Sequence, residues 1–212
     1  MSEWFLADDL SGALDAGAAF HAAGRRVRLV EATDDWWPGT DGEIVGVNTE
    51  SRNLPPAEAA ARIGAVLAHA AARGARLVFK KIDSTLRGPV AAELAAVRQH
   101  LPGHRILLCP ANPAAGRTVE QGQLLVRGVP LLATDFARDP TAPVREGNLG
   151  RLAGTAAELV IADARSEGDL ETAIAAVAAP QGPWLAVGSV LRCIAGSPAA
   201  CAAAVPREGD AE

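Results

Sequence analysis

The stretch WFLADDLSGALDAGAAFHAAG, residues 4–24, contains the pattern that decides the fold. Its apolar residues 4–7 predict a buried strand, and the polar loop DDLSG, residues 8–12, follows directly. The alanine-rich residues 13–23 then predict a helix that ends at Gly24, because glycine readily adopts the backbone conformation that closes a helix. A strand, a polar loop and a helix in this order are the first half of a β-α-β unit.

The same alternation continues along the chain. Apolar runs on both sides of Arg127-Gly128 predict a β-hairpin. Further strands are predicted at residues 26–31, 43–48, 76–80, 105–109, 158–163 and 184–189, and further helices at 57–73, 89–101 and 168–179. We therefore expect an α/β fold, with an open, mostly parallel sheet, helices on both faces and a β-hairpin insertion.

Composition excludes several classes of protein. Twenty basic and 25 acidic residues give a net charge of −5, and a pI near 5.4 argues against a general nucleic-acid binder. No apolar run approaches the roughly 20 residues that span a bilayer. Three cysteines form no CxxC pair, which indicates a reducing, cytoplasmic setting. We expect one domain over residues 1–195 and a disordered tail over 196–212.

Polar residues concentrate in the loops that follow the predicted strands. Ligands of open parallel sheets bind at the carboxyl ends of the strands, so these loops are the expected ligand site. Asp8, Asp9 and Ser11 supply more polar groups than one helix N-cap requires. One of the carboxylates can cap the helix, and the other can accept hydrogen bonds from a polyhydroxylated ligand or take a proton.

The segment KKIDSTLRGP, residues 80–89, is the richest of these loops. A helix begins directly after Arg87, so free backbone N–H groups and a guanidinium converge on a place that suits a carboxylate or a phosphate. Asp83 can offset this positive charge or bind hydroxyls. The alternative is an ion pair of Asp83 with Arg87 or Lys81 that only fixes the loop.

A third loop, residues 110–117, carries Asn112, Gly116 and Arg117. Gly116 suits a special backbone turn, and Arg117 is either an anion contact or a structural residue. The chain has no GxxxxGK[ST] motif and no GxGxxG after a strand, and its four histidines lack metal-type spacing. The residues therefore predict a site for an anionic, sugar-like ligand and no recognisable nucleotide or metal site.

Four motifs together resemble the N-terminal domain of the four-carbon acid sugar kinase family. They are ADDLSGALDAG (7–17), KKIDSTLRG (80–88), PANPAAGRTVEQG (110–122) and FARDPTAPVREGNL (136–149). The resemblance implies a two-domain kinase that uses ATP and Mg²⁺ to phosphorylate a hydroxyl of threonate, erythronate or a 3-oxo-tetronate. In that family the N-terminal domain holds the sugar acid and a C-terminal domain holds the nucleotide.

Carried over position by position, the resemblance places Asp9 and Asp83 in the substrate-side motifs. In the implied kinase, Asp9 or Asp83 is the catalytic residue that orients the acceptor hydroxyl or takes its proton. Pro89 and Gly147 depart from the family, which has asparagine and serine at these two positions. The resemblance also implies that the following residues bind the substrate: Asp8, Ser11, Ser51, Arg52, Lys81, Ser84, Arg87, Gly88, Asn112, Gly116 and Arg117.

The nucleotide-binding domain of the family is expected to be absent from this chain, so ATP and Mg²⁺ are not expected to bind it alone. Whether the chain is an enzyme stays open. It is the substrate-binding half of a kinase that acts only with a nucleotide-binding domain, a non-catalytic sugar-acid-binding module, or a truncated remnant. The expected partners are a sugar acid and either a separate nucleotide-binding domain or a second copy, with no nucleic acid and no membrane.

Overall fold

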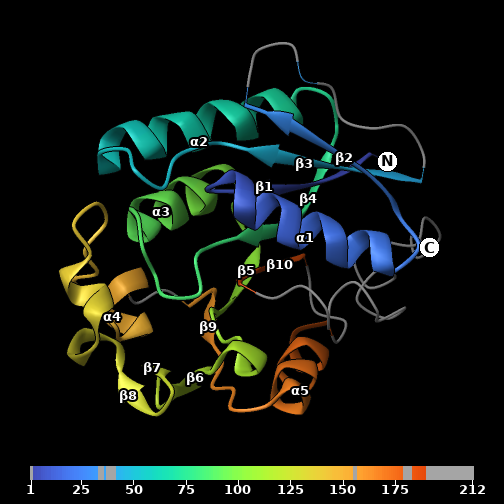
Figure 1. Ribbon diagram of the computed structural model, residues 1–212. Helices are drawn as coiled ribbons and strands as arrows, with labels where there is room; N and C mark the ends of the chain where they lie inside the picture. The colour runs from blue at the N-terminus through green and yellow to red at the C-terminus, as the bar shows by residue number, and fades with distance from the viewer. Residues whose placement is uncertain (1, 33–35, 37–41, 155–156, 179–182, 190–212) are drawn as a thin grey trace.

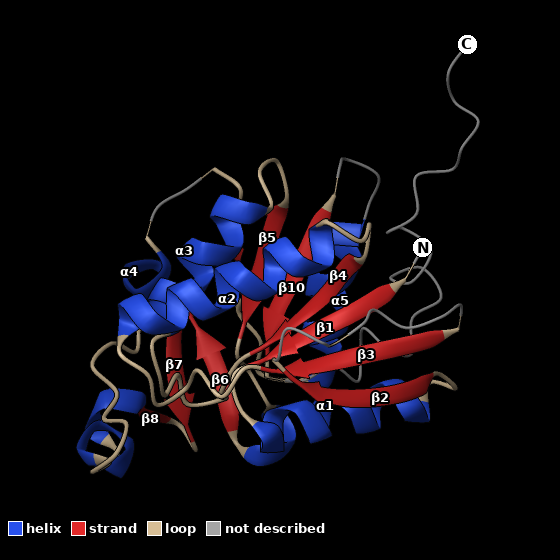
Figure 2. Cartoon of the chain, turned by 90° about the horizontal axis from the view of Figure 1, so that it is seen from above, coloured by secondary structure: helices blue, strands red, loops and turns tan. Residues whose placement is uncertain are grey.

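A computed structural model describes residues 2–32, 36, 42–154, 157–178 and 183–189, and the predicted tail lies outside these ranges. A parallel sheet of seven strands forms the centre, in the order β2-β3-β1-β4-β10-β5-β9. Figure 2 shows this order from β2 to β5. This confirms the α/β fold with a mostly parallel sheet. The strands are β1 (Glu3–Ala7), β2 (Arg26–Glu31), β3 (Glu43–Asn48), β4 (Arg76–Lys81), β5 (Arg105–Cys109), β9 (Leu159–Ile161) and β10 (Trp184–Gly188).

Helices cover both faces of this sheet, and β1 shows why. Trp4 and Leu6 join the core under α2 and α3, whereas Phe5 and Ala7 join the core under α1 and α5. Successive side chains of a strand point to opposite faces, so a strand that is apolar throughout needs cover on both sides. The helices are α1 (Leu10–Ala22), α2 (Pro56–Ala71), α3 (Val90–His100), α4 (Leu149–Ala153) and α5 (Glu167–Ala178).

Helix ends follow local chemistry. The α1 helix begins three residues earlier than predicted, because the Asp9 carboxylate accepts a hydrogen bond at 2.8 Å from the Gly12 N–H and caps the helix. The α2 helix has Pro56 in its first turn, where the missing N–H costs nothing, and it ends shortly before Gly74. None of the helices in the described ranges is long and apolar enough to cross a membrane.

The predicted hairpin is part of a three-stranded antiparallel sheet, which we call the arm. It contains β6 (Arg117–Glu120), β7 (Gln123–Val126) and β8 (Val129–Pro130), and it projects away from the main sheet (Figure 1). The turn at Arg127-Gly128 is the predicted one. A second turn at Gln121-Gly122 also has positive φ at both residues, the conformation that suits tight hairpins. It joins β7 to β6, a strand that was not predicted.

The arm is held beside the carboxyl ends of the central strands. The Asp163 carboxylate, after β9, accepts hydrogen bonds from the N–H groups of Gln121 and Gly122 at 2.6 and 2.8 Å. Val119 also forms a β-bridge with Ala164. In Figure 2 the strands point towards the side of the molecule on which the arm lies. The arm and the sheet thus share the edge at which ligands of this architecture bind.

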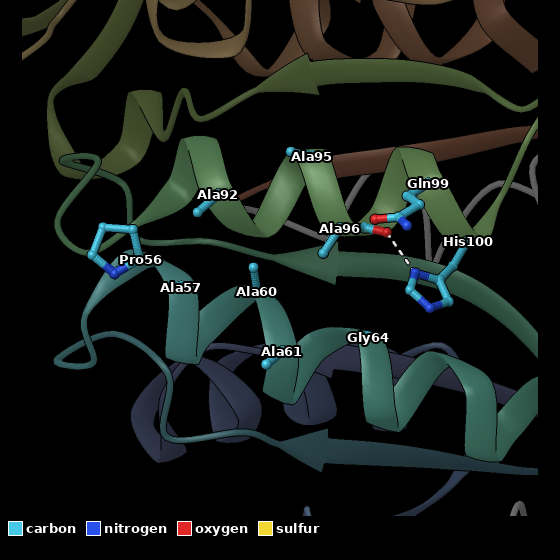
Figure 3. A pocket seen from close by; sticks show the side chains of 10 residues that line it. All are labelled: Pro56, Ala57, Ala60, Ala61, Gly64, Ala92, Ala95, Ala96, Gln99 and His100. Atoms are coloured by element: carbon cyan, nitrogen blue, oxygen red, sulfur yellow. Dashed lines mark hydrogen bonds between the residues drawn. The ribbon is translucent and has the colours of Figure 1, made fainter.

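A surface pocket of about 590 Å³ lies between α2 and α3 (Figure 3). Alanines of both helices face one another across it, and His100 lies at one end beside Gly64. The His100 Nδ1 atom is 2.9 Å from the carbonyl oxygen of Ala96. The lining has no aspartate, glutamate, lysine or arginine side chain.

Candidate functional site

The candidate site lies where the sheet changes its winding direction. The strands β1 and β4 are neighbours, but the chain continues from β1 into α1 on one face and from β4 into α3 on the other. Loops that diverge in this way leave a crevice at the carboxyl ends of the strands. The loops that meet there are residues 8–9, 49–52 and 81–88, as the contacts below show.

Arg52 joins the first two of these loops. Its Nε and Nη2 atoms donate to the Asp8 carboxylate at 2.8 and 3.2 Å, and its Nη1 and Nη2 atoms donate to Asp9 at 2.6 and 2.7 Å. The backbone N–H of Arg52 also donates to the Asp8 carbonyl oxygen at 3.2 Å. A planar guanidinium has donors on both sides, so one arginine fixes the positions of two carboxylates.

Asp83 and Arg87 form the second ion pair. The Arg87 Nε and Nη2 atoms donate to the Asp83 carboxylate at 3.1 and 2.8 Å, and the Thr85 hydroxyl donates to it at 2.5 Å. Burial alone would raise the pKa of Asp83, but hydrogen bonds from Arg87 and Thr85 and the charge of Arg52 lower it well below its ordinary value. The internal Asp83–Arg87 pair, one alternative for this loop, is therefore formed.

Gly88 allows the third loop to pack directly on the second. Its φ is +91°, and a methyl group in place of its hydrogen would lie 2.9 Å from the Arg52 carbonyl oxygen and 3.1 Å from Arg52 Cγ. Any other residue would add strain in the backbone and push Arg52 away. The glycine of the KKIDSTLRG motif therefore has a structural reason at this position.

The adjacent lysines of β4 have different surroundings. Lys80 is fully buried and forms an ion pair with Glu93 of α3, its Nζ lying 2.7 Å from Oε2. The Ser51 hydroxyl donates to Glu93 Oε1 at 2.5 Å and lies 2.8 Å from the Thr49 hydroxyl. This buried network fastens the loop that carries Arg52 to α3, and it gives Ser51 a positioning role.

Lys81 points to the other face of the sheet, towards α1. A methyl group on Gly12 would lie 3.2 Å from its Cγ atom and 3.6 Å from Nζ. The side chain is buried, and its single hydrogen bond in the described part of the chain goes to the Ile82 carbonyl oxygen at 3.2 Å. Burial lowers the pKa of Lys81, and the charges of Asp8, Asp15 and Asp83 only partly oppose this effect.

The remaining predicted residues lie farther from this cluster in their contacts. Ser11 is exposed in the first turn of α1, and Ser84 is half-buried in the loop after β4. Asn112 caps a short 3₁₀ helix, and Gly116 is left-handed with φ of +72°. Arg117 donates to the Ala115 carbonyl oxygen at 2.5 Å. The described contacts of these last three residues hold the base of the arm and do not reach the aspartates.

The arrangement brings together three carboxylates and three cationic side chains in one largely buried cluster. Asp9 is the most accessible of the carboxylates, with a side chain 19% exposed compared with 2% for Asp8 and 8% for Asp83. The described residues contain no group of three histidine, cysteine or acidic side chains placed to hold a metal ion. The cluster can bind a ligand that has both hydroxyls and an acidic group.

Sequence reasoning missed several members of the site. Glu93, Lys80 and Thr49 make the buried network, but Glu93 lies in an ordinary helical stretch and nothing marks it locally. One signal was available for Lys80, because it ends an apolar strand and is next to the only other lysine of the chain. Burial of such a residue requires a partner of opposite charge, although the sequence does not say which one.

Comparison with known proteins identifies the family of this chain. The family described as "Sugar-binding N-terminal domain" matches residues 4–157. A D-threonate kinase of Salmonella typhimurium is 35% identical over 157 residues, which cover 74% of this chain and 37% of the relative. A D-threonate kinase of Bordetella bronchiseptica is 37% identical over 180 residues, which cover 82% and 44%. The chain thus spans less than half the length of these relatives.

A solved structure has the same fold. It is a domain of unknown function from Bordetella bronchiseptica, described with bound citrate and as a domain-swapped dimer. The two chains superpose with a TM-score of 0.84 at 31% identity, over 92% of this chain and 56% of the other. Together with the parallel sheet and the aspartate–arginine cluster at its switch point, these matches show that the chain belongs to the family of sugar-binding N-terminal domains of four-carbon acid sugar kinases.

Proposed function

We propose that this chain is the substrate-binding half of an ATP-dependent kinase that phosphorylates a hydroxyl of a four-carbon sugar acid. The cluster at the switch point is the observation that supports this most. Carboxylates there can accept hydrogen bonds from ligand hydroxyls, and cationic groups can bind the acid group. The relatives named D-threonate kinase make D-threonate the first substrate to test.

Asp9 is the residue that we place against the acceptor hydroxyl. It is the most accessible carboxylate of the cluster. Asp83 is a weak proton acceptor because its pKa is low, so its role in the proposal is to orient Arg87 and Arg52. Catalysis of phosphoryl transfer depends mainly on positioning and charge stabilisation, which such a rigid cluster supplies.

ATP and Mg²⁺ belong to the second domain of the proposed kinase. Asp8, Asp9 and Asp83 already accept hydrogen bonds from arginines, so these three carboxylates do not fit a Mg²⁺ site. The chain also has no GxxxxGK[ST] loop for a nucleotide. We also propose that residues 1–195 form a single domain and that the protein is located in the cytoplasm.

A fusion protein tests the proposed function. This chain would be joined to the C-terminal part of the Bordetella bronchiseptica D-threonate kinase that lies outside the match, and ATP-dependent phosphorylation of D-threonate would be measured. We expect turnover in the fusion and at least a hundredfold lower kcat after Asp9→Ala, with D-threonate still bound. Binding of D-threonate by the fusion without any turnover would instead favour the non-catalytic sugar-acid-binding module.

A further inference from the structure

Lys81 differs from the other two cations of the site because it has no carboxylate partner. Arg52 is bound to Asp8 and Asp9, and Arg87 is bound to Asp83. Among the described residues, no carboxylate oxygen lies within 4.0 Å of the Lys81 Nζ atom, the distance that defines an ion pair. The residue is nevertheless buried, with only 6% of its surface exposed. The charges of Asp8, Asp15 and Asp83 oppose the cost of burial only in part. A buried ammonium without a directly paired carboxylate is stabilised when an anion binds beside it.

The position of this ammonium also favours anion binding. It lies against the first turn of α1, beside Gly12, where the helix dipole is positive. The N–H of Gly12 is taken by Asp9, but the N–H groups of Leu10 and Ser11 have no partner in the described part of the chain. Unpaired N–H groups at a helix start and a buried ammonium are the donors of an anion site.

Lys80 shows that burial alone does not explain this arrangement. It is the next residue in the same strand and is fully buried, but Glu93 lies 2.7 Å from its ammonium and neutralises it. Among the described residues, therefore, one lysine of the pair has a carboxylate partner and the other has only the Ile82 carbonyl oxygen. The latter lysine is the one that faces the ligand loops.

We propose that Lys81 and the first turn of α1 bind the carboxylate of the ligand, with Asp9 facing one of its hydroxyls. This inference deepens the proposed function and rests on it. A carboxylate suits this place because Lys81 lies deep in the site, whereas a phosphoryl group must arrive from the open side. Arg87 is a weaker candidate for the same task, because two of its donors already bind Asp83.

The test compares wild-type protein with Lys81→Met and Lys80→Met. Calorimetric titrations would use D-threonate, citrate and D-threitol, which has the hydroxyls of the acid but no carboxylate. We expect Lys81→Met to weaken D-threonate and citrate at least tenfold and to leave the weaker binding of D-threitol unchanged. The melting temperature of Lys81→Met should stay the same or rise, whereas that of Lys80→Met should fall, because Glu93 loses its partner.

Each of the other possible results would overturn a specific part of the proposal. Unchanged D-threonate binding in Lys81→Met, or a fall in its melting temperature equal to that of Lys80→Met, would overturn the anion subsite. Tighter binding of 4-phospho-D-threonate than of D-threonate, lost in Lys81→Met, would assign the subsite to a phosphoryl group. It would overturn the carboxylate assignment. Binding of citrate but no tetronate, lost in Lys81→Met, would keep the subsite and refute the proposed function. A folded wild-type protein that binds no anion would refute both.

Discussion

At the scale of single residues, the site depends on the geometry of Arg52. Its guanidinium binds two carboxylates from different sides, and the Asp8 side chain that it neutralises is almost completely buried. A lysine ammonium is a compact charge without a planar fork, so it cannot replace these paired contacts. The residue type is therefore fixed by shape as well as by charge.

Replacement of Arg52 should destabilise the fold as well as the site. We expect Arg52→Met to lower the free energy of unfolding by about 3 kcal/mol or more, because a buried carboxylate loses its partner. Arg52→Lys should recover only part of this loss. Urea unfolding measures both changes, with Arg138→Met as the control, since the Arg138–Asp135 pair is exposed and its loss should leave the midpoint unchanged. Equal midpoints for Arg52→Met and wild type would contradict the account.

Asp83 gives the stability a predictable dependence on pH. Its pKa is lower in the folded protein than its ordinary value of 3.8, so its ionised form stabilises the fold above about pH 4. That contribution is lost as the pH falls through the lowered folded value. The difference in unfolding free energy between wild type and Asp83→Asn should therefore be constant from pH 7 to 5 and shrink below pH 4. Chemical unfolding at each pH measures it, and a difference that grows in acid would show the opposite sign.

At the scale of secondary-structure elements, the close approach of two loops depends on Gly88. Gly88→Ala should destabilise more than Gly24→Ala, because both glycines have φ near +90° but only Gly88 would meet another residue. The left-handed backbone alone costs about 1–2 kcal/mol in each variant. Thermal unfolding of the two variants gives the comparison. The excess in Gly88→Ala reports the clash with Arg52, and equal losses would mean that this contact is unimportant.

The buried pair between β4 and α3 calls for a double-mutant cycle. Lys80→Met or Glu93→Leu alone should destabilise by about 3–5 kcal/mol, because each leaves a buried charge without its partner. The double variant should recover most of this loss, since an apolar pair can replace a buried ion pair. Urea unfolding gives the coupling energy. Additive losses in the double variant would show that the two residues act independently.

Elements were easier to predict than contacts. Strands and helices follow from apolar runs and from proline and glycine at their ends, so the parallel sheet was predictable. The start of α1 was predicted three residues too late, because the sequence offered Asp9 both as a helix cap and as a ligand-binding residue. In the structure Asp9 caps the helix and also binds Arg52. The strand β6 was missed because its turn has glutamine at the first left-handed position, where glycine or asparagine is the usual signal.

The candidate site shows the same division. Its charged residues were predictable because they follow buried strands, but their partners were not. The Arg52–Asp8 pair joins residues 44 positions apart, and only the parallel pairing of β1 with β3 brings them together. Lys80 and Lys81 are the same residue type at adjacent positions. Their surroundings differ because neighbouring residues of a strand face opposite sides of the sheet.

At the scale of the whole molecule, the fold places the charged candidate site at one edge of the sheet, whereas the pocket between α2 and α3 is lined mainly by alanine. The relatives are about twice the length of the matched region or longer, and the proposal assigns the nucleotide to that additional part. This chain should therefore bind a sugar acid without binding ATP.

Calorimetric titration of the folded chain with D-threonate, and separately with Mg-ATP, tests this central claim most directly. We expect saturable binding of D-threonate at one site, with no saturable binding of Mg-ATP. Tight binding of Mg-ATP would contradict it, because the nucleotide would then occupy residues to which neither the sequence nor the fold assigns that role. Failure of D-threonate and D-erythronate to bind a folded sample would contradict the assignment of the site itself.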